Sequence, residues 1–327
     1  MWFKDADGDV CYPGAFPFNR IPLVTDLLSI GECMVELSRH ADGRFSLAYG
    51  GDTFNTAVYA ARLGLAVAYG TALGDDPYSR GIYDLAAAEA VDMASVAALP
   101  GRVPGLYVIE TDERGERRFY YWRDSAPARG LFETANPALE RELGEAACLY
   151  FSGITLSLYS PAGLDRFAGH LEAARRRGAT IAFDGNFRPR GWGGDIKRAR
   201  STFLRFLPLV SLALPTFDDE QALWGDTDPQ ATIERLASQG VSEIVVKNGA
   251  AGVSVLAGGE RGAVAIPEPV TPVDTTAAGD SFNAGYLAGR RLGRDWREAA
   301  LLGHRLAGRV IRERGAILPK EATAGLV

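Results

Sequence analysis

A run of small residues places an aspartate on the first turn of a predicted helix. Residues 273–282 read VDTTAAGDSF, so Asp280 directly follows Ala277, Ala278 and Gly279. Backbone N–H groups at a helix N-terminus bind anions, and the helix dipole adds roughly half a positive charge there. These three small residues could therefore form a phosphate-binding turn beside Asp280, which would act as the base in phosphoryl transfer. A turn that simply opens an ordinary helix would explain the same residues without any chemistry.

A second motif lies nearer the start of the chain, where residues 50–57 read GGDTFNTA. Gly51 allows a ligand to approach the backbone closely, and Asn55 offers both a donor and an acceptor to sugar hydroxyls. Asp52 or Thr53 could equally be a helix cap and nothing more. Taken alone, this motif is a weak signal.

A third motif, DGNFR at residues 184–188, follows a predicted strand. Ligands of open α/β sheets bind at the carboxyl ends of the strands, so Arg188 is a candidate for substrate binding. In the alternative interpretation, Asp184 caps a loop and Arg188 forms a surface ion pair. Further along, Lys247 precedes a Gly-x-x-Gly turn made by Gly249 and Gly252, which a plain hairpin turn would explain about as well.

These motifs together resemble the ribokinase-like (PfkB) family of sugar kinases. Residues 274–280 are similar to its C-terminal signature Asp-Thr-x-Gly-Ala-Gly-Asp, with Ala277 in place of the usual glycine, and residues 50–55 are similar to its N-terminal signature Gly-Gly-x-x-x-Asn. The resemblance implies an α/β fold with a central, mostly parallel sheet flanked by helices on both faces, and a small antiparallel β lid. It also implies ATP and Mg²⁺ as cofactors.

The same resemblance assigns roles at the nucleotide. Lys247 would lie near the phosphates, while Gly249, Gly252 and Gly279 would shape the ATP-binding loops. His304 lies where family members line the adenine pocket, although a structural histidine explains it as well.

The family's Asn-x-x-Glu motif holds magnesium through water and corresponds to residues 216–219, which read TFDD and are followed by Glu220. Asp219 and Glu220 both remain candidates, because Mg²⁺ keeps several waters and tolerates indirect contact.

An aromatic and basic run at residues 119–123, FYYWR, bears on the substrate. An arginine on a lid strand suits a planar carboxylate, so Arg123 and Arg188 together imply an anionic substrate. The run resembles the lid of the 2-keto-3-deoxygluconate kinases in this family. The positions that contact the sugar acid in those enzymes match Gly51, Asn55, Tyr107, Tyr121, Arg123, Arg188 and Asp280.

The resemblance implies ATP-dependent phosphorylation of the terminal 6-hydroxyl of 2-keto-3-deoxygluconate. Two alternatives stay open. One is a kinase of the same fold for another sugar, such as fructose, and the other is a non-catalytic regulator that binds a sugar acid.

The elements that must position these residues follow from hydrophobic periodicity. From Leu27 onward, short apolar runs alternate with segments of helical period, which predicts a largely parallel sheet covered by helices. Strands are predicted at residues 27–30, 67–71, 148–152, 180–184, 209–214 and 243–247, and helices around residues 54–65, 164–174 and 296–310.

Two aromatic and β-branched runs, residues 105–110 and 117–123, flank the turn-like segment 111–116 and predict a β-hairpin. Joined to residues 44–49, the hairpin would form the lid. So small a sheet must lean on the main domain or on a second copy, which predicts a homo-oligomer formed through the lid. The predicted domains are an N-terminal extension, 1–26, and a kinase domain, 27–327, with its lid at about 43–50 and 102–124.

Composition excludes several other functions. The net charge of −6 gives no support to nucleic-acid binding, and 47% hydrophobic with 23% charged residues is typical of a globular protein. Cys11, Cys33 and Cys148 are odd in number and widely spaced, which argues against a disulfide framework or a zinc site and fits a cytoplasmic protein. No signal peptide or membrane span is predicted. The expected partners are a small sugar acid and ATP.

Overall fold

The computed structural model describes residues 3–4, 10–11, 25–40, 42–111 and 117–326. Its centre is a nine-stranded sheet in the order β17-β16-β15-β14-β13-β12-β3-β6-β8. The strands from β15 to β8 run parallel, and β16 and β17 extend the sheet antiparallel at one edge. The strands are β3 (Leu27–Ile30), β6 (Val67–Gly70), β8 (Val91–Asp92), β12 (Cys148–Ser152), β13 (Thr180–Asp184), β14 (Leu212–Ala213), β15 (Glu243–Lys247), β16 (Val253–Ala257) and β17 (Glu260–Val264).

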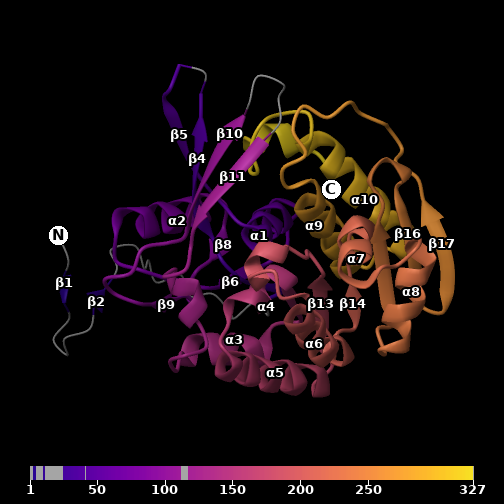
Figure 1. Ribbon diagram of the computed structural model, residues 1–327, viewed down its shortest axis with the longest axis horizontal. Helices are drawn as coiled ribbons and strands as arrows, with labels where there is room; N and C mark the ends of the chain where they lie inside the picture. Colours follow the sequence, from indigo (N-terminus) through magenta and orange to yellow (C-terminus); the bar gives the residue numbers. More distant parts are fainter. Residues whose placement is uncertain (1–2, 5–9, 12–24, 41, 112–116, 327) are drawn as a thin grey trace.

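Helices cover both faces of this sheet, and each face has its own apolar core (Figure 1). One core joins the sheet to α1 (Asp52–Arg62), α2 (Pro77–Ala88), α9 (Ala278–Arg291) and α10 (Trp296–Val310). The other joins it to α3 (Pro137–Glu145), α4 (Gly153–Leu158), α5 (Pro161–Arg176), α6 (Ile196–Phe206), α7 (Phe217–Trp224) and α8 (Pro229–Ser238).

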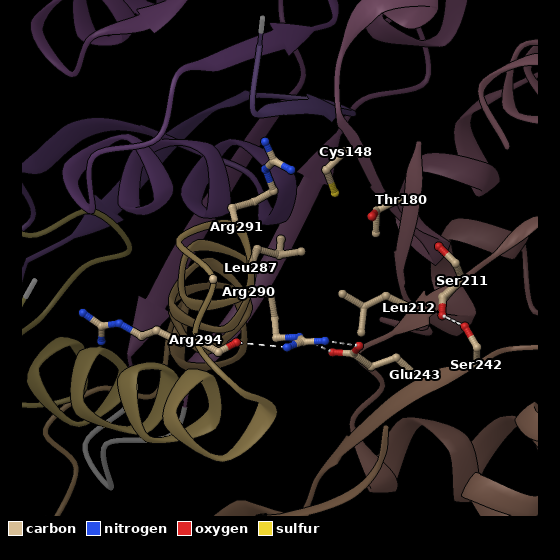
Figure 2. A pocket seen from close by; sticks show the side chains of 11 residues that line it. Cys148, Thr180, Ser211, Leu212, Ser242, Glu243, Leu287, Arg290, Arg291 and Arg294 are labelled. Atoms are coloured by element: carbon tan, nitrogen blue, oxygen red, sulfur yellow. Dashed lines mark hydrogen bonds and ion pairs between the residues drawn. The ribbon is translucent and has the colours of Figure 1, made fainter. Parts of the chain in front are cut away.

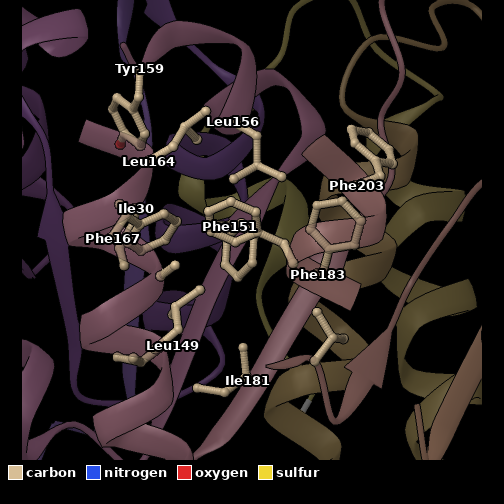
Figure 3. Close-up of a cluster of buried hydrophobic side chains, with 14 of the residues drawn as sticks. Ile30, Leu149, Phe151, Leu156, Tyr159, Leu164, Phe167, Ile181, Phe183 and Phe203 are labelled. Atoms are coloured by element: carbon tan, nitrogen blue, oxygen red, sulfur yellow. The ribbon is translucent and has the colours of Figure 1, made fainter. Parts of the chain in front are cut away.

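The alternation of side chains along the central strands creates these two cores. In β12, Leu149 and Phe151 point to the α5 side, where Phe151 packs edge-on against Phe167 at 5.0 Å between ring centroids (Figure 3). Tyr150, which lies between them in sequence, belongs to the α1 and α9 side. A strand that is buried on both faces shows a continuous apolar run, and this is the pattern that predicted it.

A separate four-stranded sheet forms the lid, which projects beyond the main sheet (Figure 1). Its order is β11 (Arg117–Trp122), β10 (Leu106–Thr111), β4 (Met34–Arg39) and β5 (Phe45–Gly50). The predicted hairpin is β10 and β11, and the predicted third strand is β5. The sequence did not reveal β4, which pairs antiparallel with β5 and parallel with β10. The central position of β4 joins the two hairpins into one sheet.

Short elements complete the chain. They are β1 (Phe3–Lys4) with β2 (Val10–Cys11), β7 (Ala72–Leu73) with β9 (Ala97–Ala98), and the 3₁₀ turns η1 (Pro127–Gly130), η2 (Pro189–Trp192), η3 (Leu207–Leu209), η4 (Gly249–Ala251) and η5 (Lys320–Thr323).

The strand predicted at residues 209–214 is shorter than expected. Its first part is η3, because Pro208 lacks the N–H that a central strand needs, and pairing begins only at Leu212. The turn predicted at residues 111–116 and the extension at 1–26 lie largely outside the described residues. Within the described part of the chain, no helix is long and apolar enough to cross a membrane.

Candidate active site

Asp280 lies in the first turn of α9, as the sequence predicts. The helix begins after Ala277, which adopts the left-handed conformation with φ 59°. A residue with a Cβ is strained in that conformation, and this explains why glycine suits the position. The N–H of Ala278 donates to the Thr275 carbonyl at 3.2 Å, so one of the three predicted phosphate-binding amides already has a partner in this state.

The carboxyl group of Asp280 lies in a buried, acidic environment that raises its pKa. Burial raises its pKa to about 7; the charge of Asp52 is the next largest cause, and Asp184 adds to the increase. A hydrogen bond from Asn55 Nδ2 to Asp280 Oδ2, 2.8 Å long, acts in the opposite direction, as does Lys247. A general base works best when its pKa lies close to the working pH.

Helix α1 brings the second motif to the same point. The Gly51 N–H donates weakly to Asn55 Oδ1 at 3.4 Å, which orients the amide so that its NH₂ group faces Asp280. Thr56 Oγ1 lies 3.2 Å from the Asp280 carbonyl and ties the first turns of α1 and α9 together. A Cβ on Gly51 would lie 2.0 Å from the Glu32 carbonyl oxygen, so only glycine fits there.

A buried polar network lies behind α9. Lys247 Nζ, at the carboxyl end of β15, donates to Asp184 Oδ2 at 2.8 Å and to Asn283 Oδ1 at 2.9 Å. Asn283 Nδ2 donates in turn to Asp184 Oδ2 at 2.6 Å and to the Tyr150 hydroxyl at 3.0 Å. A Cβ built on Gly279 would lie 3.5 Å from Lys247 Nζ, so the ammonium group lies directly beneath the start of α9. The sequence did not single out Asn283 or Tyr150.

The two glycines after Lys247 shape a tight turn. Gly249 and Gly252 have φ of 49° and 85°, and a Cβ on Gly252 would lie 2.3 Å from the Val264 carbonyl oxygen. That same carbonyl is 3.1 Å from His304 Nε2. His304 is buried against Phe282, with 5.1 Å between ring centroids, and burial lowers its pKa.

The two candidate magnesium carboxylates point to different places. Asp219, in the first turn of α7, accepts hydrogen bonds from Arg188 Nη1 at 2.8 and 2.9 Å. Glu220 is buried and pairs with Arg235 at 2.6 Å. Burial raises the pKa of Glu220 to about 7. Between the two, the geometry favours Asp219.

The inner face of the lid carries the remaining predicted residues. Tyr107 is buried and donates from its hydroxyl to Glu36, and its ring lies 5.8 Å from that of Tyr121. Arg123 forms an ion pair with the buried carboxylate of Glu32. Arg123 and Arg188 each have an acidic partner, Glu32 and Asp219 respectively. The ion pair that the alternative interpretation expects for Arg188 is therefore present. Nothing in the sequence motifs marked Glu32 or Glu36.

The structure thus brings together side chains that lie far apart in sequence, at the carboxyl ends of the parallel strands. The arrangement fits the groups that a kinase needs. The start of α9 and the ammonium group of Lys247 can receive phosphates. After burial, the charge of Asp184 raises the pKa of Asp52, and the charges of Asp52 and Asp184 raise the pKa of Asp280. A bound cation would offset this effect. Within the described residues, no three acidic, histidine or cysteine side chains are grouped so that they could hold a metal ion directly.

Cavities lie both beside this cluster and at the other end of the sheet. One, of about 550 Å³, lies beneath the lid and is bordered by Glu36 and Ala316. The other, of about 330 Å³, lies where the central strands begin, opposite the site (Figure 2). There Arg290 pairs with Glu243 at 2.8 Å, at the C-terminal end of α9, where a cation also stabilises the helix dipole.

Residues 24–323 match the model of the pfkB family of carbohydrate kinases. The chain belongs to this family. A relative, the 2-dehydro-3-deoxygluconokinase of Escherichia coli (strain K12), is 43% identical over 303 residues, which are 90% of this chain and 97% of the relative.

Solved structures of family members share the fold. The 2-dehydro-3-deoxygluconokinase of Thermotoga maritima has a TM-score of 0.79 at 22% identity, covering 92% of this chain and 99% of that one. A ribokinase II of E. coli in complex with ATP and Mg²⁺ has a TM-score of 0.80 at 24% identity, covering 92% and 96%. The protein is therefore a carbohydrate kinase with the ribokinase-like fold that its sequence predicts.

Proposed function

We propose that this protein transfers the γ-phosphoryl group of ATP to the 6-hydroxyl of 2-keto-3-deoxygluconate, also called 2-dehydro-3-deoxygluconate. The products are 2-keto-3-deoxy-6-phosphogluconate and ADP. The observation that carries the proposal is Asp280, with its pKa of about 7, fixed by Asn55 at the N-terminus of α9. The 43% identity to a kinase named for this substrate supports the choice of sugar acid.

In the reaction, Asp280 accepts the proton of the 6-hydroxyl while the oxygen of that hydroxyl forms a bond to the γ-phosphorus. The bond from that phosphorus to the bridging oxygen of ADP breaks on the opposite side. Ala277 and Gly279 offer their backbone N–H groups to the transferred group, and the dipole of α9 favours the negative charge there. Lys247 supplies a fixed positive charge below the same turn, held by Asp184 and Asn283.

Mg²⁺, when bound, neutralises charge on the nucleotide phosphates. Asp219 is the residue we assign to it, through water, because Glu220 is committed to Arg235. Asp219 faces Arg188 at the edge of the site, and burial is the main cause that raises its pKa. A cation nearby would restore its charged form.

The sugar acid would lie between the lid and the main sheet, in contact with Gly51, Asn55, Tyr107, Tyr121, Arg123 and Arg188. Asn55 and the Tyr107 hydroxyl both lie close to Gly50, within 3.4 Å of the position of a Cβ there, so one ligand can reach both. Arg123 and Arg188 are held by Glu32 and Asp219, and these pairs orient the two guanidinium groups for a carboxylate.

A coupled ADP-release assay over sugar acids and neutral sugars tests the proposal. The wild-type enzyme should use 2-keto-3-deoxygluconate with a kcat/KM orders of magnitude above that for fructose or ribose. Asp280→Asn should lose about 10²–10⁴-fold in kcat, and Asp218→Asn, a change at an exposed neighbour of Asp219, should lose little. Equal use of fructose and the keto acid would refute the substrate assignment.

We also propose that two copies associate through the outer face of the lid. Cross-strand neighbours share a face, and Leu47, Tyr120 and Trp122 lie opposite to the face of Tyr107. Trp122 is 60% exposed and Leu47 is 51% exposed, and such an apolar face suits burial against a second lid. Sedimentation of the wild type and of Trp122→Ser tests this, since the variant should be more monomeric; a monomeric wild type would contradict it.

A further inference from the structure

A third arginine borders the candidate active site. Arg190 lies in η2, two residues after Arg188, at the end of the segment that follows β13. Its guanidinium carbon is 5.1 Å from the centre of the Tyr121 ring, which belongs to β11 of the lid. Burial raises the pKa of the Tyr121 hydroxyl, and the positive charges of Arg123, Arg188 and Arg190 all oppose that increase, so the three arginines lie near one side chain.

The three arginines differ in their partners. Arg123 is paired with Glu32, and Arg188 is held by both oxygens of Asp219. Among the described residues, Arg190 has its contact with the Tyr121 ring and no carboxylate within ion-pair distance. Its guanidinium is therefore the one whose charge is not already balanced by an acid of the protein.

The contact with Tyr121 also sets where this charge lies. Tyr121 is the cross-strand neighbour of Tyr107, so both rings lie on the inner face of the lid. The Tyr107 hydroxyl and Asn55 Oδ1 approach the same point near Gly50, and Asn55 contacts the proposed base. Arg190 thus meets the lid on the face that looks toward Asp280.

We propose that Arg190 is a specificity-determining residue that binds the carboxylate of the sugar acid, which rests on the function proposed above. A guanidinium without an acidic partner gains more favourable interaction energy from an incoming carboxylate. A guanidinium that is already paired must first give up or share its ion pair. The ring of Tyr121 orients Arg190 and keeps one face of the guanidinium covered, while its N–H groups stay available at the edge.

The same contact also allows a purely structural role, in which Arg190 only fastens the lid to the main domain. The two roles predict different substrate dependence. A carboxylate-binding residue matters only for substrates that carry the carboxylate, whereas a fastening residue matters for every substrate that the lid covers. Arg198, which stacks on Trp192 at 5.3 Å on α6, makes a comparable contact without facing the lid and offers a matched control.

The test compares 2-keto-3-deoxygluconate with 2-keto-3-deoxyglucose, which carries an aldehyde in place of the carboxylate and keeps the 6-hydroxyl. Arg190→Gln should lower kcat/KM for the acid by about 10–100-fold, mainly through KM, and change it for the aldehyde by less than about threefold. Arg198→Gln should leave both values unchanged, and Arg190→Lys should lie between the wild type and Arg190→Gln.

Equal losses for acid and aldehyde in Arg190→Gln, or no loss for either, would overturn the assignment of Arg190 alone. A wild-type enzyme that does not phosphorylate the keto acid would overturn the proposed function and, with it, this inference. Melting temperatures of the variants, measured without ligand, separate misfolding from loss of binding. Titration calorimetry with the keto acid should show the same weakening in Arg190→Gln as the KM.

Discussion

The pH dependence of the reaction should be set by Asp280 and should move when Asp52 loses its charge. With a pKa of about 7, about half of the base is deprotonated at pH 7 and about a tenth at pH 6. The kcat/KM for the sugar acid should therefore fall about fivefold between pH 7 and pH 6, and about tenfold for each unit below that.

The perturbation is Asp52→Asn, which keeps the shape of the side chain and removes its charge. The charge of Asp52 is the largest cause, after burial, that raises the pKa of Asp280, so the variant should shift the acidic limb to lower pH. At pH 6 only about a tenth of Asp280 is deprotonated in the wild type, so full deprotonation in the variant can raise kcat/KM at most about tenfold. Asp52 also accepts a hydrogen bond from Asn186 at 2.7 Å, which an asparagine can replace by rotating its amide.

The assay is ADP release from pH 5 to 9 at constant ionic strength, with Asp218→Asn as a control for a charge change at the surface. Carbon-13 NMR of labelled aspartate in the ligand-free protein measures the Asp280 pKa directly. A profile that stays flat down to pH 5, or an acidic limb that moves upward in Asp52→Asn, would refute the reasoning that links these two carboxylates.

Three other changes have defined outcomes. Asp280→Asn should raise the melting temperature by several degrees at pH 8. Burial raises the pKa of Asp280 to about 7, against about 3.9 for an ordinary aspartate, so the protonated form stabilises the protein at low pH. This contribution, up to about 4 kcal/mol, is lost as the pH rises through 7. The advantage should vanish toward pH 4, and a gap that persists there in thermal scans would contradict this account. Ala277→Gly should raise the melting temperature by about 2 °C, because it relieves the left-handed φ of 59°; a decrease would mean that the strain is not felt. Deleting residues 1–24 should change the melting temperature by less than about 2 °C and leave kcat unaltered, since described packing starts where the Thr25 carbonyl accepts the Ala147 N–H at 2.9 Å; a fall above about 5 °C would show that the deleted segment packs into the fold.

The sequence predicted the central sheet well because buried parallel strands leave a continuous apolar run. Cys148–Ser152 and Thr180–Asp184 lie where the pattern placed them. By contrast, β4 was missed, because its far end is only partly buried and its polar residues Ser38 and Arg39 resemble a loop.

Local motifs singled out Asp280, the proposed base, and Asn55, but they could not show which groups each charged side chain faces. Asp280 and Asn55 lie 225 residues apart and meet through a hydrogen bond that no spacing rule predicts. Glu220 was indistinguishable from Asp219 in sequence, yet a step of one residue along α7, about 100° of helix, turns it toward Arg235. Arg123 directly follows β11 and Glu32 lies just before β4. Their ion pair therefore depends on the topology of the lid sheet, which neither segment reveals alone.

The lid and the helix that carries Asn55 are joined directly in the backbone. Strand β5 ends at Gly50 and α1 begins at Asp52, so Gly51 alone joins the lid to the helix that carries Asn55. A tilt of the lid toward a bound sugar would act on this joint, where the Glu32 carbonyl oxygen lies too close for any residue other than glycine. The displacement would reach the hydrogen bond that lowers the pKa of Asp280.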